Sequence, residues 1–163
     1  LHKKVERDIS PVPLMCVEFY LLTRLAGATK TLLWKLIIAS TWMLVAGYIG
    51  EAFSDGSTSH SVTWGVLSTV GYLYVLYTAW FGEVAQLAAN SKSEVIQKGV
   101  KALAWFVLVG WAIYPIGYMI GTDGWYDFVD ALGWNMEVVY NVGDAVNKIG
   151  FGLVIYNLAV SDK

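Results

Sequence analysis

Charged residues are scarce in this sequence. Asp, Glu, Lys and Arg make up 15% of its 163 residues and 56% are hydrophobic, whereas soluble domains carry about 25% charged residues. This composition excludes an ordinary soluble domain. A net charge of −2 gives no electrostatic argument for nucleic-acid binding. Cys16 is the only cysteine, which excludes a disulfide framework and a cysteine-based metal site.

The sequence also lacks the signatures of common enzymes. It contains no phosphate-binding glycine loop, no histidine-rich spacing of metal ligands and no Ser-His-Asp arrangement. We therefore predict no metal site and no hydrolytic or phosphoryl-transfer chemistry, and we expect that the protein is not an enzyme. Aromatic residues, in contrast, reach 15%. This excess favours packing around a flat apolar ligand as well as anchoring at a membrane surface.

Long apolar stretches dominate the chain. A helix that crosses the hydrocarbon core needs about 20 mostly apolar residues. We predict five such spans, of which the first is short: 11–26, 32–53, 62–85, 100–120 and 136–160. Polar or glycine-rich linkers separate them: 27–30, 54–61, 90–98 and 121–130. The predicted fold is all-α, a polytopic transmembrane helix bundle that forms one domain over residues 1–163, with an atypical segment at 1–10.

The loop charges predict an orientation, because Lys and Arg collect on the cytoplasmic side of a membrane protein. Seven cations fall on one side of the predicted bundle: Arg24, Lys30, Lys35, Lys92, Lys98, Lys101 and Lys163. The opposite loops hold acidic residues and neither Lys nor Arg: Asp55, Asp123, Asp127, Asp130 and Glu137. We therefore expect a multi-pass cell-membrane protein with its C-terminus in the cytoplasm. Lys3, Lys4 and Arg7 would then lie outside, against the rule.

Two charged residues interrupt the fifth span. Asp144 and Lys148 are four positions apart, so they share one face of a helix. One interpretation is a structural ion pair, although apolar replacements of such pairs are often neutral. The functional interpretation is a lysine that forms a Schiff base with an aldehyde. The resulting buried cation needs a carboxylate nearby, and Asp144 supplies one.

The fourth span carries an aromatic stripe. Trp111, Tyr114, Pro115 and Tyr118 fall at i, i+3, i+4 and i+7, which is one face of a helix. Core packing is the commoner use of such a stripe. Pro115, however, permits a kink, and a kinked helix that presents aromatic rings toward a buried lysine suits a rigid polyene ligand.

Together, the stretches 110–118 and 140–152 resemble microbial rhodopsins, most closely the proteorhodopsin and xanthorhodopsin branch. The resemblance covers 13–160 as helices C to G of that seven-helix fold, so helices A and B are not in this chain. It implies that retinal binds as a Schiff base to Lys148, with Asp144 as the counterion on helix G.

The same resemblance implies a set of retinal-contacting residues. On helix F, the pocket wall is formed by Trp111, Tyr114, Pro115 and Tyr118. Helix D contributes Met43 and Gly47 near the polyene and its ring, and Tyr140 belongs to the matching stretch of helix G. Met15 matches the position at which the family tunes colour, where an apolar residue implies green rather than blue absorption.

Two further positions have alternative interpretations. Glu18 matches the carboxylic proton donor on helix C, and the alternative is a lipid-facing or interfacial carboxylate. Gly65 follows Trp64 at the start of helix E, where xanthorhodopsin-like members have a glycine that opens a window for a carotenoid antenna. The alternative for Gly65 is a small residue at a helix contact.

The start of helix C departs from the family pattern. The family has Arg, a counterion Asp three residues later, and then Trp. Here an ungapped match places Arg7 at the position of the proton acceptor. Asp8 would occupy that position only if one residue were deleted. No Trp follows in either case. The sequence therefore leaves the proton acceptor and the direction of pumping open, with Asp8 as the candidate.

The resemblance implies a light-driven outward proton pump. An inward pump and a photosensory rhodopsin with the same retinal site are the alternatives, and a structural bundle without a cofactor is a fourth hypothesis. The expected partners are membrane lipid, retinal and protons, within a homo-oligomer that the resemblance implies to be a pentamer or trimer.

Overall fold

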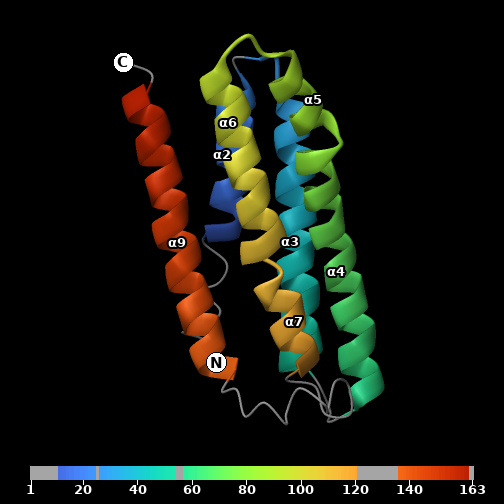
Figure 1. Cartoon of the computed structure of the whole chain (residues 1–163). Coiled ribbons are helices and arrows are strands. Elements are labelled where there is room, and N and C mark those ends of the chain that lie inside the picture. The colour runs from blue at the N-terminus through green and yellow to red at the C-terminus, as the bar shows by residue number, and fades with distance from the viewer. Residues whose placement is uncertain (1–10, 25, 54–56, 121–135, 162–163) are drawn as a thin grey trace.

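The computed structural model describes residues 11–24, 26–53, 57–120 and 136–161, and these residues form helices joined by short turns. The elements are α2 (Pro11–Arg24), α3 (Lys30–Ala52), α4 (Thr58–Trp80), α5 (Glu83–Asn90), α6 (Glu94–Trp105), the π-helix η1 (Phe106–Gly110), α7 (Ile113–Ile120) and α9 (Met136–Ser161) (Figure 1). The prediction of an all-α fold is confirmed.

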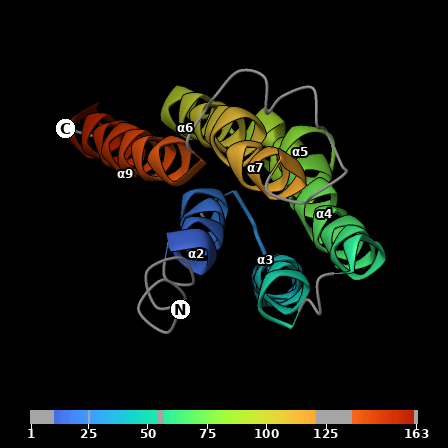
Figure 2. The same ribbon diagram turned by 90° about the horizontal axis from the view of Figure 1, so that it is seen from below.

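The helices run roughly alongside one another in one bundle, and α6, η1 and α7 follow each other as a single interrupted rod (Figure 1). Seen end-on, α9, this rod and α4 form a row, and α2 and α3 lie on one side of it (Figure 2). Helix α3 packs against both α2 and α4, whereas α9 packs against α6, η1 and α7. Among the described helices, Lys30–Ala52 and the rod Glu94–Tyr118 are each long and apolar enough to cross a membrane.

The predicted third span differs from the structure at its end. It was expected to continue to residue 85, but α4 ends at Trp80, and the N–H groups of Phe81 and Gly82 both donate to the carbonyl of Tyr77 at 2.8 Å. Helix α5 then begins at Glu83. These backbone hydrogen bonds end the helix before Glu83. The prediction missed the break because hydropathy does not report on backbone hydrogen bonding.

Short caps and turns fix the other helix ends. The Thr29 side chain accepts a hydrogen bond from the N–H of Leu32 and so begins α3, and Ser93 does the same for Ile96 at the start of α6. Gly27, in the turn before α3, has a φ of 99°. Glycine suits this left-handed conformation because it has no Cβ.

The core lies between α2, α3, α4 and the interrupted rod. Cys16 and Phe19 of α2 are fully buried, as are Leu32 of α3 and Leu103 of α6. Many large apolar side chains face outward instead, such as Ile38, which is 65% exposed. An apolar exterior of this kind suits contact with lipid.

The cationic loops meet at one end of the bundle. Arg24 ends α2, Lys30 begins α3 and Lys92 lies between α5 and α6, and these element ends are at the same end of the bundle as the end of α9 (Figure 1). These three predicted cations therefore lie on one side, whereas Lys163 lies outside the described residues. We call this end the cationic end.

Candidate functional site

The charged pair of the last helix forms in the structure. Lys148 Nζ donates to Asp144 Oδ2 at 2.6 Å, one helical turn away on α9. The Lys148 side chain is 49% exposed and that of Asp144 is 31% exposed. Since α9 runs toward the cationic end (Figure 1), Asp144 lies on the side of Lys148 that is farther from that end.

A different face of α9 contacts the interrupted rod. A Cβ at Gly143 would lie 2.8 Å from Cδ1 of Ile113, and a Cβ at Gly150 would lie 2.5 Å from Cζ of Phe106. Because successive helical residues are turned by about 100°, Lys148 and Asp144 project beside this contact face and not into it. The described residues therefore hold α9 through its glycine-rich side and leave the charged pair partly open.

The rod is broken at the level of the charged pair, where Asn147 faces Gly110. In η1 the N–H of Trp111 donates to the carbonyl of Phe106 at 3.2 Å, five residues back, and the N–H of Tyr114 donates to Trp111 at 3.1 Å, three residues back. Pro115 has no N–H and cannot continue the ladder. The predicted kink is confirmed, and it lies one turn before Pro115.

The break also divides the aromatic stripe. Trp111 lies in the turn between η1 and α7 and is 2% exposed, whereas Tyr114, Pro115 and Tyr118 lie on α7 and are partly buried. Trp111 therefore lies just outside the helix that carries the other three residues of the stripe. Tyr118 reaches away from α9, and its hydroxyl donates to the carbonyl of Ser61 on α4 at 2.7 Å.

The predicted helix-D residues lie where α3 meets α4. Met43 is buried, and its carbonyl accepts a hydrogen bond from Ser68 Oγ at 2.6 Å. A Cβ at Gly47 would lie 3.4 Å from the same Ser68 oxygen. Gly65 is buried on α4, and its carbonyl accepts a bond from Thr69 within that helix.

Glu18 lies on α2 close to the buried residues Cys16 and Phe19. Its side chain is partly buried, and Oε2 is buried without a hydrogen-bond partner among the residues that the structure describes. An unpartnered buried carboxyl oxygen is costly, so such a group is a candidate for function.

Three predicted site residues lie wholly or partly outside the described residues. Asp8 lies outside the described residues, and Met15 and Tyr140 lie on α2 and α9 with side chains outside the described part. Their roles stay predictions.

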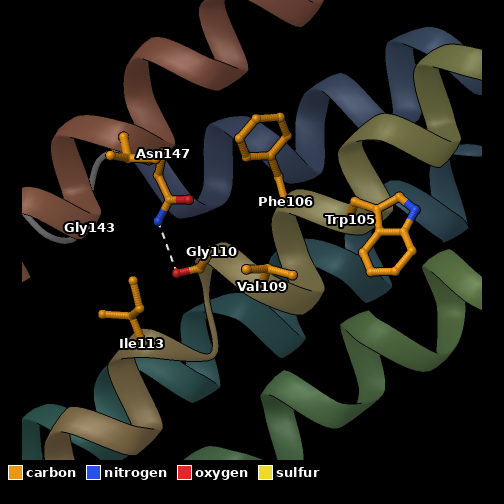
Figure 3. A pocket seen from close by; sticks show the side chains of 8 residues that line it. Trp105, Phe106, Val109, Gly110, Ile113, Gly143 and Asn147 are labelled. Carbon is orange, nitrogen blue, oxygen red and sulfur yellow. Dashed lines mark hydrogen bonds between the residues drawn. The ribbon is translucent and has the colours of Figure 1, made fainter.

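A cavity of about 270 Å³ lies beside α9, away from the predicted pocket wall. It is lined by Trp105, Phe106, Val109, Gly110, Ile113, Gly143, Val146 and Asn147 (Figure 3). At its edge, the Asn147 side-chain amide donates to the carbonyl of Gly110 at 2.9 Å (Figure 3). Sequence reasoning missed Asn147 and Gly110. The available signals were an amide next to Lys148 in an apolar stretch and a glycine five residues before Pro115.

Comparison with known proteins identifies the family. Residues 9–162 match the profile of the bacteriorhodopsin-like proteins. The chain belongs to this family of microbial rhodopsins. Membership makes it a multi-pass membrane protein of a family of transporters and photoreceptors, and it implies retinal as the chromophore.

Individual members of the family are similar over nearly the whole chain. The green-light absorbing proteorhodopsin of Gamma-proteobacterium EBAC31A08 is 38% identical over 159 residues, which cover 93% of this chain and 58% of that protein. The chain thus spans less than two thirds of the length of this relative.

Solved rhodopsin structures have the same arrangement of helices. Exiguobacterium sibiricum rhodopsin matches with a TM-score of 0.79 and 31% identity over 95% of this chain and 69% of that one. Xanthorhodopsin, described as a light-driven ion pump with a dual chromophore, matches with a TM-score of 0.75 and 28% identity over 98% of this chain and 62% of its own. The expected resemblance to the proteorhodopsin and xanthorhodopsin branch is confirmed.

Proposed function

We propose that the chain is the retinal-binding part of a light-driven proton pump that moves protons outward, and that Lys148 holds the retinal. The observation that carries the proposal is the ion pair of Lys148 with Asp144 at 2.6 Å on one face of α9. We also propose that residues 1–163 form one domain.

The residues present fit the cofactor. Lys148 offers the primary amine that a covalent link to an aldehyde requires, and Asp144 offers the anion that balances a positive nitrogen. Retinal, when bound, supplies a polyene that absorbs visible light and changes shape. We assign the wall of its pocket to Trp111, Tyr114, Pro115, Tyr118, Met43, Gly47, Met15 and Tyr140.

A purely structural ion pair explains the site less well. A charged residue within a membrane-spanning helix is costly, and the structural benefit of an ion pair is often matched by apolar residues. Glycines, apolar side chains and the bond of Asn147 to the Gly110 carbonyl already hold α9 against the rod. The pair therefore adds little that packing does not supply.

The order of the carboxyl groups along the bundle supports outward transport. Glu18 is six residues from Arg24, which ends α2 at the cationic end, or about 9 Å at 1.5 Å per residue. Lys148 is 13 residues from Ser161, or about 20 Å by the same rise. If the cationic end is cytoplasmic, Glu18 is placed to return a proton to the Lys148 nitrogen from inside. Asp144 and the candidate acceptor Asp8 would then act on the outer side.

Other features of the proposal follow from family resemblance. Met15 favours green absorption, and Gly65 favours a carotenoid antenna that would contact the retinal ring. We also propose a homo-oligomer, a pentamer or trimer, with the C-terminus in the cytoplasm.

A visible spectrum tests the retinal site. The purified protein should develop an absorption band at longer wavelength than free retinal after all-trans-retinal is added. Lys148→Ala should abolish this band, because no other amine occupies that position on α9. Lys35→Ala is the matched control: Lys35 forms an exposed pair with Glu83 at 3.5 Å, and its loss should leave the band intact. A band that survives in Lys148→Ala contradicts the proposal, as does a protein that stays colourless.

Light-induced pH changes test the direction. Illuminated cells that express the protein with retinal should acidify their medium. Alkalinisation would indicate an inward pump instead, and a coloured protein without any pH change would indicate a photosensor.

The role of Glu18 is tested by the recovery of the ground state after a flash. Glu18→Gln removes the proposed internal donor, so recovery should slow by about 100-fold or more, the usual contribution of a positioned acid. The control is Glu83→Gln, which removes a carboxylate from α5 near the cationic end and should leave recovery unchanged. Equal recovery in the Glu18 variant and the control would exclude Glu18 as the donor.

A further inference from the structure

The carbonyl of Gly110 lies at the point where the rod breaks. In a regular helix it would accept from the N–H of Tyr114, four residues on, but that N–H donates to Trp111 at 3.1 Å. The next residue, Pro115, has no N–H to offer. The break thus takes its regular helical donor away from this carbonyl, and Pro115 cannot replace that donor in a π-type turn; an unsatisfied carbonyl inside a membrane-spanning segment is costly.

Helix α9 supplies the replacement donor. Asn147 Nδ2 lies 2.9 Å from the Gly110 oxygen, and the amide points across the gap between the two elements (Figure 3). A Cβ at position 110 would overlap the Asn147 amide. Only glycine at this position therefore lets the two helices approach closely enough for the bond.

The two neighbouring contacts of α9 cannot replace this bond. One turn before it, Gly143 meets Ile113, and one turn after it, Gly150 meets Phe106. Both are apolar contacts with flexible side chains, so they favour close approach but define the rotation of α9 only loosely. The amide bond is directional, and Asn147 is the residue immediately before Lys148.

We propose that Asn147 is a positioning residue for Lys148: by donating to the Gly110 carbonyl at the break of the rod, it fixes the rotation of α9 and so the direction in which the Lys148 side chain projects relative to the rod. This inference rests on the proposed function, in that Lys148 carries retinal. It adds a residue that is not among those of the predicted pocket wall.

Three substitutions at one position test the proposal. Asn147→Leu keeps the approximate size and removes the donor, and Asn147→Ala removes the donor without adding bulk, in case leucine prevents folding. Asn147→Gln keeps the donor, and the adjacent cavity of about 270 Å³ has room for its extra methylene group. The matched control is Asn157→Leu, at an exposed asparagine on the same helix.

Two readouts separate positioning from mere stability. In the retinal-free protein, the amides of α7 should exchange with deuterium about threefold faster in the Leu and Ala variants, a factor typical of one interhelical hydrogen bond in a membrane. With retinal bound, the same variants should shift the absorption band, because the Lys148 nitrogen and its anion are then turned together relative to the aromatic side chains of the rod. Asn147→Gln should restore the wild-type band, and Asn157→Leu should not move it.

The outcomes are distinguishable. If exchange accelerates while the band stays in place, Asn147 only stabilises the helix packing and the proposal fails. It also fails if both donor-free variants match the control in both readouts, or if Gln does not move the band back toward its wild-type position. A wild-type protein that takes up no colour would overturn the proposed function itself, whatever the exchange rates show.

Discussion

The hairpin of α3 and α4 and the last helix α9 are held in the bundle in different ways. In the hairpin, a Cβ at Gly71 would lie 2.7 Å from the backbone carbonyl of Ala39, so the two backbones are in near contact. Ser68 donates to the carbonyl of Met43 at 2.6 Å, and Ser61 donates to that of Gly50 at 3.3 Å. Small residues and side-chain-to-backbone bonds of this kind are the usual means of helix association in membranes.

Helix α9 carries the charged pair and, apart from the one bond of Asn147 to the Gly110 carbonyl, has looser contacts. Its glycines meet the side chains of Ile113 and Phe106 and not a backbone. A Cβ at Gly152 would have no neighbouring atom within 4 Å among the described residues beyond its own stretch of helix, and Lys148 and Asp144 remain partly exposed. The difference teaches that the rigid packing and the charged pair lie in separate parts of the chain. Helices α3 and α4 are packed rigidly, whereas α9 carries Lys148 and Asp144 and can move with less disturbance of the core.

Substitution of Gly71 should produce the largest loss of stability. Gly71→Ala places a methyl group against backbone that cannot move without shifting α3, so we expect the free energy of unfolding to fall by about 1–3 kcal/mol. Titration of the detergent-solubilised protein with SDS measures the change. The matched control is Gly152→Ala on α9, which should be neutral within about 0.5 kcal/mol. Equal losses in the two variants would contradict the contrast between the two regions.

A glycine on the contact face of α9 should have an intermediate effect. In Gly150→Ala the new methyl group meets the ring of Phe106, and a ring can turn aside where a backbone carbonyl cannot. We expect a loss of about 1 kcal/mol, at the lower end of the range for overpacking. The same SDS titration measures it. A loss as large as that of Gly71→Ala would show that α9 is packed as rigidly as the hairpin.

Removal of one bond between α3 and α4 should have a smaller effect. Ser68→Ala deletes the donor to Met43 and should lower the free energy of unfolding by about 0.6 kcal/mol, the average for such bonds in a membrane protein. Ser59→Ala, at an exposed position of the same helix, is the control. If the two variants unfold at the same SDS concentration, the bond does not stabilise the hairpin.

The surface ion pair of α6 should have the smallest effect. Lys98 and Glu94 are 2.9 Å apart, with side chains 77% and 80% exposed. Because water screens such pairs, Lys98→Ala should lower the free energy of unfolding by less than any of the other three substitutions, and this difference should vanish in high salt. A larger loss of unfolding free energy that persists in high salt would show that Lys98 stabilises the start of α6 through contacts other than this ion pair.

The existence and order of the spanning helices could be predicted from the sequence, because hydropathy identifies apolar segments directly. All five predicted spans contain helices of the structure. The ends were less accurate: α6 begins at Glu94 and not near residue 100, since its first turns are charged and amphipathic. Hydropathy finds the part of a helix that lies in hydrocarbon, and helices often extend beyond it.

Within the candidate site, sequence spacing predicted local relations and missed distant ones. The contact between Asp144 and Lys148 follows from four residues of one helix, and the structure contains it. The bond from Asn147 to Gly110 joins residues 37 positions apart. It depends on a π-helix and on a carbonyl that loses its donor, and neither can be read from the composition of the segment. That Trp111 lies in a turn and Tyr114 on the following helix could not be predicted for the same reason.

The buried position of Cys16 makes the chain well suited to site-directed labelling. It is the only thiol in the sequence and is 0% exposed, so maleimide and methanethiosulfonate reagents have poor access to it. A second cysteine at an exposed position such as Ile149, which is 65% exposed, would then react alone. A spin label or fluorophore attached there would report on the movement of the last helix without background from the native sulfur.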